Sequence, residues 1–256
     1  MELLGVVVSD VIKGYAVGSR ELRVLDGISL RCPPGEFVSL LGPSGAGKTT
    51  LLRLIAGLDR PDHGEVVYID GSLRQVAPSR VRIGMVFQEP RLLPWASVAK
   101  NVSYGLQGRA KTMSRSEQER AVFDALELLG LRPFSSYLPH QISGGMAQRA
   151  ALARALVGEP DLLLLDEPLG SLDIKNRLAI QDVLSQLAGA RTCIMVTHSI
   201  EEAVYLSDRI YVLSDRPALV KSEIHVRLPR PRDRVAPGFS TYARQVIRAL
   251  GVTPAR

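Results

Sequence analysis

The sequence predicts an α/β fold with a mainly parallel sheet, an N-terminal antiparallel β region and a helical subdomain. Two short apolar runs, at 162–165 and 192–197, have the length and composition of central strands that are covered on both faces. Residues 176–187 between them have helical spacing, so strand, helix and strand alternate as they do in parallel sheets. The opening third of the chain has apolar residues at a period of two, which indicates further strands.

The first strands and the first helix follow in a clear order. Strand-like patterns cover 5–15 and 28–42, and residues 48–58 then have helical spacing. Residues 64–71 indicate a second strand pair, and residues 82–90 indicate a buried strand that ends at a proline. A strand, a glycine loop and a helix are therefore expected in succession.

From residue 94 to about residue 158 the pattern becomes helical. Ser114 and Glu117 form a capping box ahead of one helix. The apolar face of that helix is formed by Val122, Ala125, Leu126 and Leu129. One last amphipathic helix is indicated by Phe239, Tyr242, Val246, Ile247 and Leu250.

The same patterns suggest how the chain divides into domains. We expect one main domain at 1–225 and a basic C-terminal tail with a short helix at 226–256. Within the main domain, a core at 1–93 and 159–225 carries the helical subdomain at 94–158.

Composition fits a folded chain with a sizeable core. Of 256 residues, 46% are hydrophobic and 23% are charged. No uncharged apolar run reaches the roughly 18 residues that a spanning helix needs. The start, MELLGVVVSDV, lacks a basic region and a cleavage site. We expect no membrane-spanning helix and no export signal, and we expect Cys32 and Cys193 to be buried, reduced thiols.

The net charge of +6 and a sequence pI near 9.5 favour anionic partners such as nucleotides, lipid headgroups or nucleic acid. Much of the charge lies in RLPRPRDR, at 227–234, where only Asp233 opposes four arginines. We interpret this stretch as a solvated arginine-rich linker, because proline-rich charged stretches seldom pack.

The glycine-rich stretch GPSGAGKT, at 42–49, satisfies G-x-x-x-x-G-K-[ST] between a strand and a helix. Its glycines let successive N–H groups point at phosphate oxygens, and the following helix adds its positive N-terminus. Lys48 would reach the β- and γ-phosphates, and the Thr49 hydroxyl would ligate magnesium. The alternative, a glycine turn that merely joins strand to helix, leaves the lysine and the hydroxyl without a purpose.

A phosphate loop alone leaves kinases, G proteins, helicases and transport ATPases open. Asp166 and Glu167 stand at the carboxyl end of an apolar strand, where ligands of open α/β sheets bind. Asp166 can hold magnesium through water, and Glu167 can polarise or orient the attacking water. Simple surface charge is the alternative, but it explains poorly why a hydrophobic run ends in paired acids.

Two further polar residues follow predicted strands. Gln88 comes after the buried strand at 82–87 and could contact magnesium or the attacking water. His198 closes the strand at 192–197 and could hydrogen-bond the γ-phosphate, although a lone strand-end histidine is more often structural.

The segment ISGGMAQRAALARAL, at 142–156, indicates a second anion site. Ser143 is a good N-cap, and Gly144 and Gly145 leave backbone amides open to an anion. The alternative is a capped helix that packs through its small residues. An ATP shared between two copies of the chain would explain why one chain needs two such sites.

Together these motifs resemble the ATP-binding-cassette (ABC) family from about Val7 to Pro217, in the order and spacing of that family. The matching segments are GPSGAGKTT as Walker A, Gln88 as the Q-loop glutamine, ISGGM as the signature, LLLLDEP as Walker B, Ser171 to Asp173 as the D-loop and His198 as the switch histidine. The resemblance implies a RecA-like core and a head-to-tail dimer with two ATPs at its interface. Each ATP would be held by Walker A of one copy and by Ser143 and Gly145 of the other.

The resemblance also implies roles for single residues. The catalytic residues would be Lys48, Gln88, Glu167 and His198. The nucleotide-binding residues would be Tyr15, Gly42, Pro43, Ser44, Gly45, Ala46, Gly47, Lys48, Thr49, Thr50, Ser143, Gly144, Gly145 and Asp173. The metal-binding residues would be Thr49, Gln88 and Asp166, and the cofactors ATP and Mg²⁺. Tyr15 matches the aromatic that stacks on adenine, a contact of about 1–3 kcal/mol.

Three positions depart mildly from the family pattern. Ile142 replaces the usual leucine of the signature, Ser199 follows the switch histidine where aspartate is commoner, and Ser171 stands where the D-loop often has alanine. None of these changes removes a catalytic group. The resemblance therefore implies an active enzyme.

Within the family, GLDRPDHGEV, VFQEPRLLPWASVAKNV and THSIEEAVYLSDRIYVLSDRP are most similar to ATPases of nitrate, alkanesulfonate or taurine importers. This resemblance implies a peripheral subunit at the cytoplasmic face of the cell membrane. Its partners would be transmembrane permease subunits and, indirectly, an extracytoplasmic substrate-binding protein, with no nucleic acid. Residues 92–95 would form an apolar groove for a permease helix; alternatively, Trp95 is an ordinary core aromatic.

Two other functions stay open at this point. The positive charge suggests a soluble ABC ATPase that acts on nucleic acid or ribosomes, although the chain lacks a second cassette and a long coiled-coil insert. A small P-loop kinase or a non-hydrolysing nucleotide sensor is the third candidate, and the signature helix argues against both.

Overall fold

The computed structural model describes residues 3–18 and 20–251, and its centre is a six-stranded sheet of order β10-β9-β3-β8-β7-β6. The strands are β3 (Phe37–Leu41), β6 (Ile83–Val86), β7 (Leu162–Asp166), β8 (Thr192–Val196), β9 (Arg209–Leu213) and β10 (Val220–His225). The strands from β9 to β6 run parallel, and β10 pairs with β9 antiparallel. Every residue of β3, β7 and β8 is buried, which confirms them as central strands.

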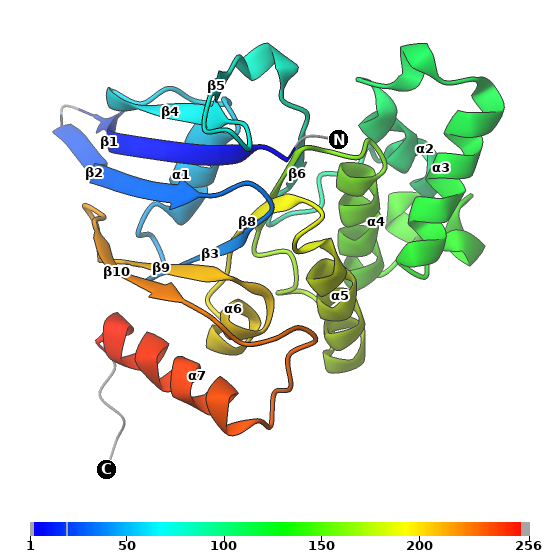
Figure 1. The fold of residues 1–256 in the computed structure, drawn as a ribbon. Helices are drawn as coiled ribbons and strands as arrows, with labels where there is room; N and C mark the ends of the chain where they lie inside the picture. Colours follow the sequence, from blue (N-terminus) through cyan, green and yellow to red (C-terminus); the bar gives the residue numbers. More distant parts are fainter. Residues whose placement is uncertain (1–2, 19, 252–256) are drawn as a thin grey trace.

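The N-terminal sheet is antiparallel, as predicted, and has the order β2-β1-β4-β5. Its strands are β1 (Gly5–Val17), β2 (Arg20–Cys32), β4 (His63–Ile69) and β5 (Gln75–Val76). Helix α1 (Lys48–Ile55) buries Leu51, Leu52 and Ile55 in a core that both sheets share (Figure 1). The glycine loop before α1 is therefore fixed by packing on two sheets at once.

The segment at 94–158 is mainly helical, as its pattern predicts, and stands beside the two sheets in Figure 1. Its helices are α2 (Val98–Ser103), α3 (Arg115–Leu128) and α4 (Gly144–Leu156). The capping box of α3 is present, because Ser114 N donates to Glu117 Oε2 at 2.6 Å and Glu117 N donates to Ser114 Oγ at 3.3 Å. Val122 and Leu126 are buried, as the apolar spacing predicts.

Three more helices complete the fold. They are α5 (Ile174–Leu187), α6 (Ile200–Leu206) and α7 (Pro237–Leu250). The predicted helices at 176–187 and 239–250 are confirmed, and both cysteines are buried and unpaired. Within residues 3–18 and 20–251, none of the helices combines the length and the apolar character that a bilayer crossing needs.

The interpretation of residues 227–234 as a solvated linker is wrong. The side chain of Arg232 is only 1% exposed, and its Nη1 donates to the carbonyl oxygens of Val204 (2.7 Å) and Ser207 (2.6 Å) at the end of α6. The last carbonyls of a helix have no partner within the helix, and a guanidinium offers five donors. The buried arginine therefore satisfies backbone groups that α6 leaves unpaired.

The arginines on either side of Arg232 extend this contact, and we call Arg230, Arg232 and Arg234 the arginine strap. Arg230 Nη2 donates to Leu206 O (2.6 Å) and to Asp208 Oδ1 (2.8 Å). Arg234 stacks 3.5 Å above the ring of Tyr205 in α6, and its Nη2 donates to a side-chain oxygen of α5 at 2.6 Å. The strap leads into α7, which packs against α6 (Figure 1). Residues 252–256 of the predicted tail lie outside the described residues.

Candidate functional site

The phosphate loop lies where the motif predicts, between β3 and α1. Gly45 and Gly47 have φ angles of +76° and +93°, in the left-handed region that favours glycine. A Cβ atom at Gly47 would lie 2.6 Å from Val24 Cγ1, so position 47 also lacks room for a side chain. These two constraints explain why the loop needs glycine at these points.

Lys48 closes the loop on itself. Its ammonium group donates to the carbonyl oxygens of Gly42 (2.8 Å) and Pro43 (2.7 Å), and the residue is buried. Burial lowers the pKa of Lys48, while the charges of Glu167 and Asp166 oppose that shift. The structure thus places a partly desolvated cation at the loop, next to two carboxylates.

The first of these carboxylates, Asp166, stands at the carboxyl end of β7 and is 3% exposed. The Thr49 hydroxyl donates to Asp166 Oδ1 at 3.1 Å. Burial raises the pKa of Asp166, an effect that the Thr49 hydrogen bond only partly offsets. The structure therefore brings together two of the three residues that the sequence proposed for magnesium, and leaves a buried carboxylate oxygen beside a hydroxyl.

Two of the other predicted catalytic residues, Gln88 and His198, contact Glu167. Its Oε2 lies 3.4 Å from Gln88 Nε2 and 3.4 Å from His198 Nδ1. Its φ angle of +45° is unusual for a residue with a side chain.

Ser199, one of the departures from the family pattern, caps α6 by accepting a hydrogen bond from Glu202 N at 3.2 Å. Serine here does the capping that aspartate would also do.

A cavity of about 440 Å³ opens above the phosphate loop. It is lined by Tyr15, Leu22, Val24, Ser44, Gly45, Gly47, Lys48, Thr49, Thr50, Gln88, Glu167 and Arg216. Tyr15 lies at its wall, where its hydroxyl donates to Asp59 Oδ2 at 2.8 Å. Most of the residues predicted to bind or hydrolyse nucleotide thus share one cavity.

Sequence reasoning missed Leu22, Val24 and Arg216. Leu22 lies opposite Tyr15 in the β1–β2 pairing, and the alternating pattern of β2 was the only signal for it. Arg216 stands in the turn between β9 and β10, far from any nucleotide motif along the chain. Only the folded structure brings these three residues to the cavity.

The signature segment lies elsewhere. The Oγ atom of Ser143 accepts a hydrogen bond from Met146 N at 3.2 Å and so caps α4, while Gly144 and Gly145 form its first turn. Asp173 caps α5 in the same way by accepting from Asn176 N at 3.0 Å. None of these four predicted nucleotide-binding residues lines the cavity at the phosphate loop.

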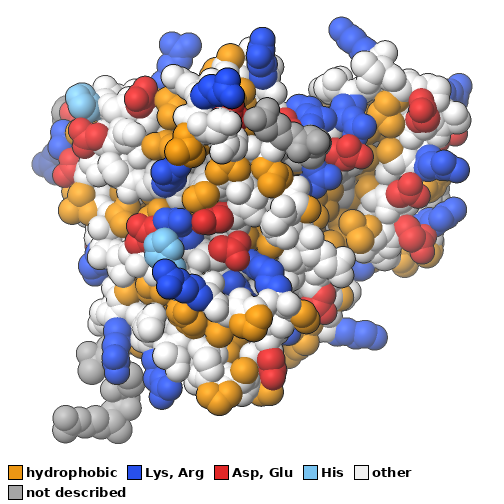
Figure 2. Space-filling view, viewed as in Figure 1, with side chains coloured by type: hydrophobic (Ala, Val, Ile, Leu, Met, Phe, Trp, Pro, Cys, Tyr) orange, Lys and Arg blue, Asp and Glu red, His pale blue; other side chains and the backbone are white. Residues whose placement is uncertain are grey.

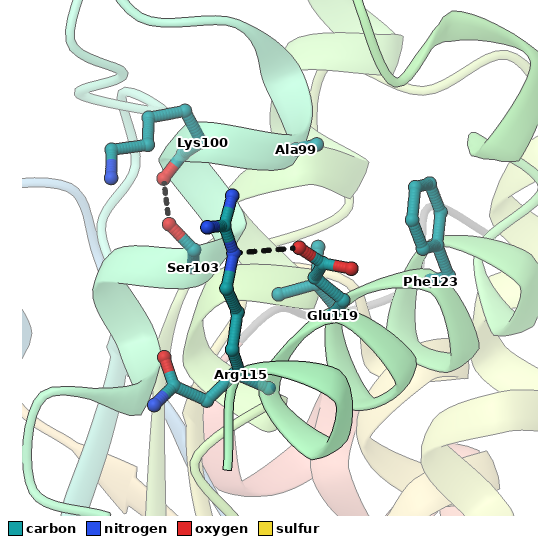
Figure 3. Close-up of a pocket in the computed structure, with 8 residues that line it drawn as sticks. Ala99, Lys100, Ser103, Arg115, Glu119 and Phe123 are labelled. Carbon is teal, nitrogen blue, oxygen red and sulfur yellow. Dashed lines mark hydrogen bonds and ion pairs between the residues drawn. The ribbon is translucent and has the colours of Figure 1, made fainter. Parts of the chain in front are cut away.

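A second hollow, of about 390 Å³, lies between α2 and α3. Figure 3 shows Arg115 of α3 reaching toward Ser103 of α2, with Glu119 of α3 turned toward Arg115. The ion pair between Arg115 Nε and Glu119 Oε1, at 3.3 Å, is exposed to solvent and contributes little stability. No residue predicted to act on nucleotide lines this hollow, so it is distinct from the cavity at the loop.

A glycine loop at the start of a helix, a lysine folded into it and an acidic strand end beside it define a P-loop nucleotide-binding protein. Comparison with known proteins narrows this class. The family model described as "ABC transporter" matches residues 25–170. The chain therefore belongs to the ABC transporter ATP-binding family, and it is an ATPase.

Individual relatives agree with this assignment. The chain is 46% identical to aliphatic sulfonates import ATP-binding protein SsuB 1 of Xanthomonas axonopodis pv. citri, over 88% of each chain. It is 40% identical to ABC transporter ATP-binding protein MJ0412 of Methanocaldococcus jannaschii, over 95% of this chain and 90% of the relative. A solved dimeric ATP-binding cassette, MJ0796, with ADP and phosphate bound, is similar with a TM-score of 0.79 and 34% identity, over 87% of this chain and 99% of the other.

Proposed function

We propose that this chain is the ATP-hydrolysing subunit of an importer of the sulfonate, taurine or nitrate type. The observation that carries the proposal is the convergence of Gln88 and His198 on one oxygen of Glu167, at the wall of the phosphate-loop cavity. The reaction transfers the γ-phosphoryl group of ATP to water. The name of the sulfonate-import relative supports the cargo class.

Glu167 acts on the attacking water in this proposal. Two neighbours, 3.4 Å away, hold its Oε2 from different elements, the loop after β6 and the loop after β8. A carboxylate held in this way can accept a hydrogen bond from water and orient it toward phosphorus. Lys48 provides positive charge for the phosphates when it exchanges its loop carbonyls for phosphate oxygens.

The residues of the site fit magnesium. Mg²⁺ prefers hard oxygen ligands and is usually held by one or two carboxylates together with substrate phosphates. Thr49 and Asp166 offer a hydroxyl and a buried carboxylate 3.1 Å apart, and Gln88 adds an amide oxygen. Within the described part of the chain, no group of three or more His, Cys, Asp or Glu residues could hold a metal. The ion would therefore need oxygen ligands from the phosphates as well. When bound, the ion would neutralise phosphate charge.

A second copy of the chain would complete the site. At the N-terminus of α4, Ser143 is exposed ahead of two glycine amides, and the first turn of the helix contains no acidic side chain. In a head-to-tail homodimer, Ser143, Gly144, Gly145 and Asp173 would face the ATP on the partner's phosphate loop. The dimeric state of the similar solved cassette supports this arrangement.

The permease would bind at residues 92–95, on the cytoplasmic face of the membrane. Trp95 is 74% exposed, so the alternative that it is a core aromatic is wrong. Asn101 of α2 holds the loop at 92–96 in place, because Leu93 N donates to Asn101 Oδ1 (2.7 Å) and Asn101 Nδ2 donates to Ala96 O (2.9 Å). A large apolar side chain on a braced loop suits a protein partner. We propose that the helical subdomain at 94–158 moves with that partner.

The test of this function is uptake in the organism that makes the chain. Deletion of the gene should abolish uptake of at least one of an alkanesulfonate, taurine and nitrate. The normal gene should restore uptake, and a gene carrying Glu167→Gln should not. Unchanged uptake of all three compounds would overturn the importer assignment.

The nucleic-acid alternative loses its main support in the structure. It rested on the positive charge, yet the arginine strap uses part of that charge inside the fold. On the face in Figure 2, the basic side chains are interspersed with acidic ones. A salt-sensitive shift of added DNA or RNA at physiological ionic strength would revive this alternative.

A further inference from the structure

The turn between β9 and β10 forms part of the wall of the nucleotide cavity. Backbone hydrogen bonds join it to β2, with Ala218 N donating to Val24 O at 2.8 Å and Asp26 N donating to Ala218 O at 3.0 Å. Ser214 closes the turn, because Ser214 N donates to Leu219 O and Leu219 N donates to Ser214 Oγ, both at 2.9 Å. The turn therefore has a fixed position relative to β2.

The same strand fixes the turn relative to the phosphate loop. Val24 packs so closely on Gly47 that the glycine could carry no Cβ atom. At the start of the phosphate loop, Gly42 lies against Leu213, the last residue of β9, since a Cβ atom there would meet Leu213 O at 3.1 Å. The turn and the loop thus belong to one rigid wall.

Arg216 stands on this turn and lines the cavity. Its side chain has no hydrogen bond, ion pair or ring contact with any residue at 3–18 or 20–251. By contrast, Arg209 is paired with Glu36 at 3.0 Å. An unpaired cation on a fixed turn, at the wall of a cavity built for a polyanion, is placed to bind that anion.

The position of the turn indicates which part of the nucleotide it faces. Tyr15 and Leu22, opposite each other on β1 and β2, mark one end of the cavity, and Glu167 marks the hydrolytic end. The turn is anchored at Val24, which lies two residues from Leu22 on β2 and packs against Gly47 of the phosphate loop. We propose that Arg216 binds the phosphates that remain in ADP, the α- and β-phosphates of nucleotide bound to the same chain. This inference rests on the proposed function only for the orientation of ATP, with its γ-phosphate at Glu167.

Such a contact is the same before and after hydrolysis. It therefore strengthens the binding of ATP and ADP equally and leaves the chemical step alone. The expected signature of Arg216→Ala is a KM for ATP that rises about tenfold, the loss typical of a charge-assisted hydrogen bond, with an unchanged kcat. Arg216→Lys should lose less, because it keeps the charge.

The experiment measures dissociation constants of the purified chain for ATP, ADP and 2′,3′-dideoxy-ATP by calorimetry. Arg216→Ala should weaken all three by the same factor of about ten. Arg244→Ala, which removes an exposed arginine of α7, should weaken none of them. Thermal unfolding of both variants should match the unchanged chain, since both side chains are exposed.

Three results would overturn the assignment. A loss that disappears with dideoxy-ATP would place Arg216 on the ribose hydroxyls, and a loss for ATP without one for ADP would place it on the γ-phosphate. Unchanged affinity for all three nucleotides would remove it from the site. These binding measurements are independent of cargo, so failure of the importer assignment would not affect them.

Discussion

Two regions of this molecule bury cationic side chains for opposite purposes. In the phosphate loop, Lys48 donates to two loop carbonyls beside an open cavity, so phosphate oxygens can replace them. In the arginine strap, Arg232 donates to carbonyls at the end of a buried helix, where no ligand can compete. Burial lowers the pKa of both residues, that of Arg232 to about 10. Burial of a cation therefore does not by itself indicate a binding site; Lys48 differs from Arg232 in that it lines an open cavity.

The comparison predicts that changes at the loop cost activity and changes at the strap cost stability. The largest effect is expected for Glu167→Gln, because glutamine cannot act as a base toward water. Steady-state phosphate release should fall by about 10²–10⁴-fold, while ATP still binds. Glu65→Gln, an exposed change on β4, is the control. Near-normal phosphate release by Glu167→Gln would remove Glu167 from its proposed role.

At the strap, Arg232→Met should destabilise the fold by about 3 kcal/mol, because it leaves buried carbonyls of α6 without donors. Urea unfolding followed by circular dichroism measures this loss. Arg244→Ala on the exposed side of α7 should change the free energy of unfolding by less than about 0.5 kcal/mol. An Arg232→Met chain of unchanged stability would contradict the capping role of the strap.

The smallest effects are expected at two serines, Ser143 and Ser114, which cap helices in the same way. Comparing them separates a loss of stability from a loss of activity. Alanine at either position should cost about 1 kcal/mol of stability, measured by thermal unfolding. Only Ser143→Ala should also reduce the rate of ATP hydrolysis, since only that hydroxyl is proposed to reach the partner's ATP. Equal hydrolysis by the two variants would leave Ser143 a simple cap and weaken the shared-site proposal.

The parts of the site that sequence could predict are those that contiguous residues build. The loop at 42–49 and the acidic strand end at 166–167 each place the reactive side chains and the residues that set the local backbone within a few positions. Their sequence pattern is therefore enough to predict both the local structure and its role. Contacts between residues that are far apart in the sequence leave no such local pattern. Arg216 reaches the cavity because a turn pairs with β2, and Arg232 is buried because α6 ends beside it. The charge of 227–234 was visible in the sequence, but its partners, backbone carbonyls at 204–207, were not.

The arginine strap also sets when the chain can finish folding as it is synthesised. The carbonyls at 204–207 emerge from the ribosome before the arginines at 230–234 that satisfy them. Because folding begins while the chain is still growing, α6 passes through a period in which its final turn is unfinished. That helix begins two residues after His198, so we expect the segment that holds this proposed switch histidine to reach its full stability only after residues 230–234 have been made.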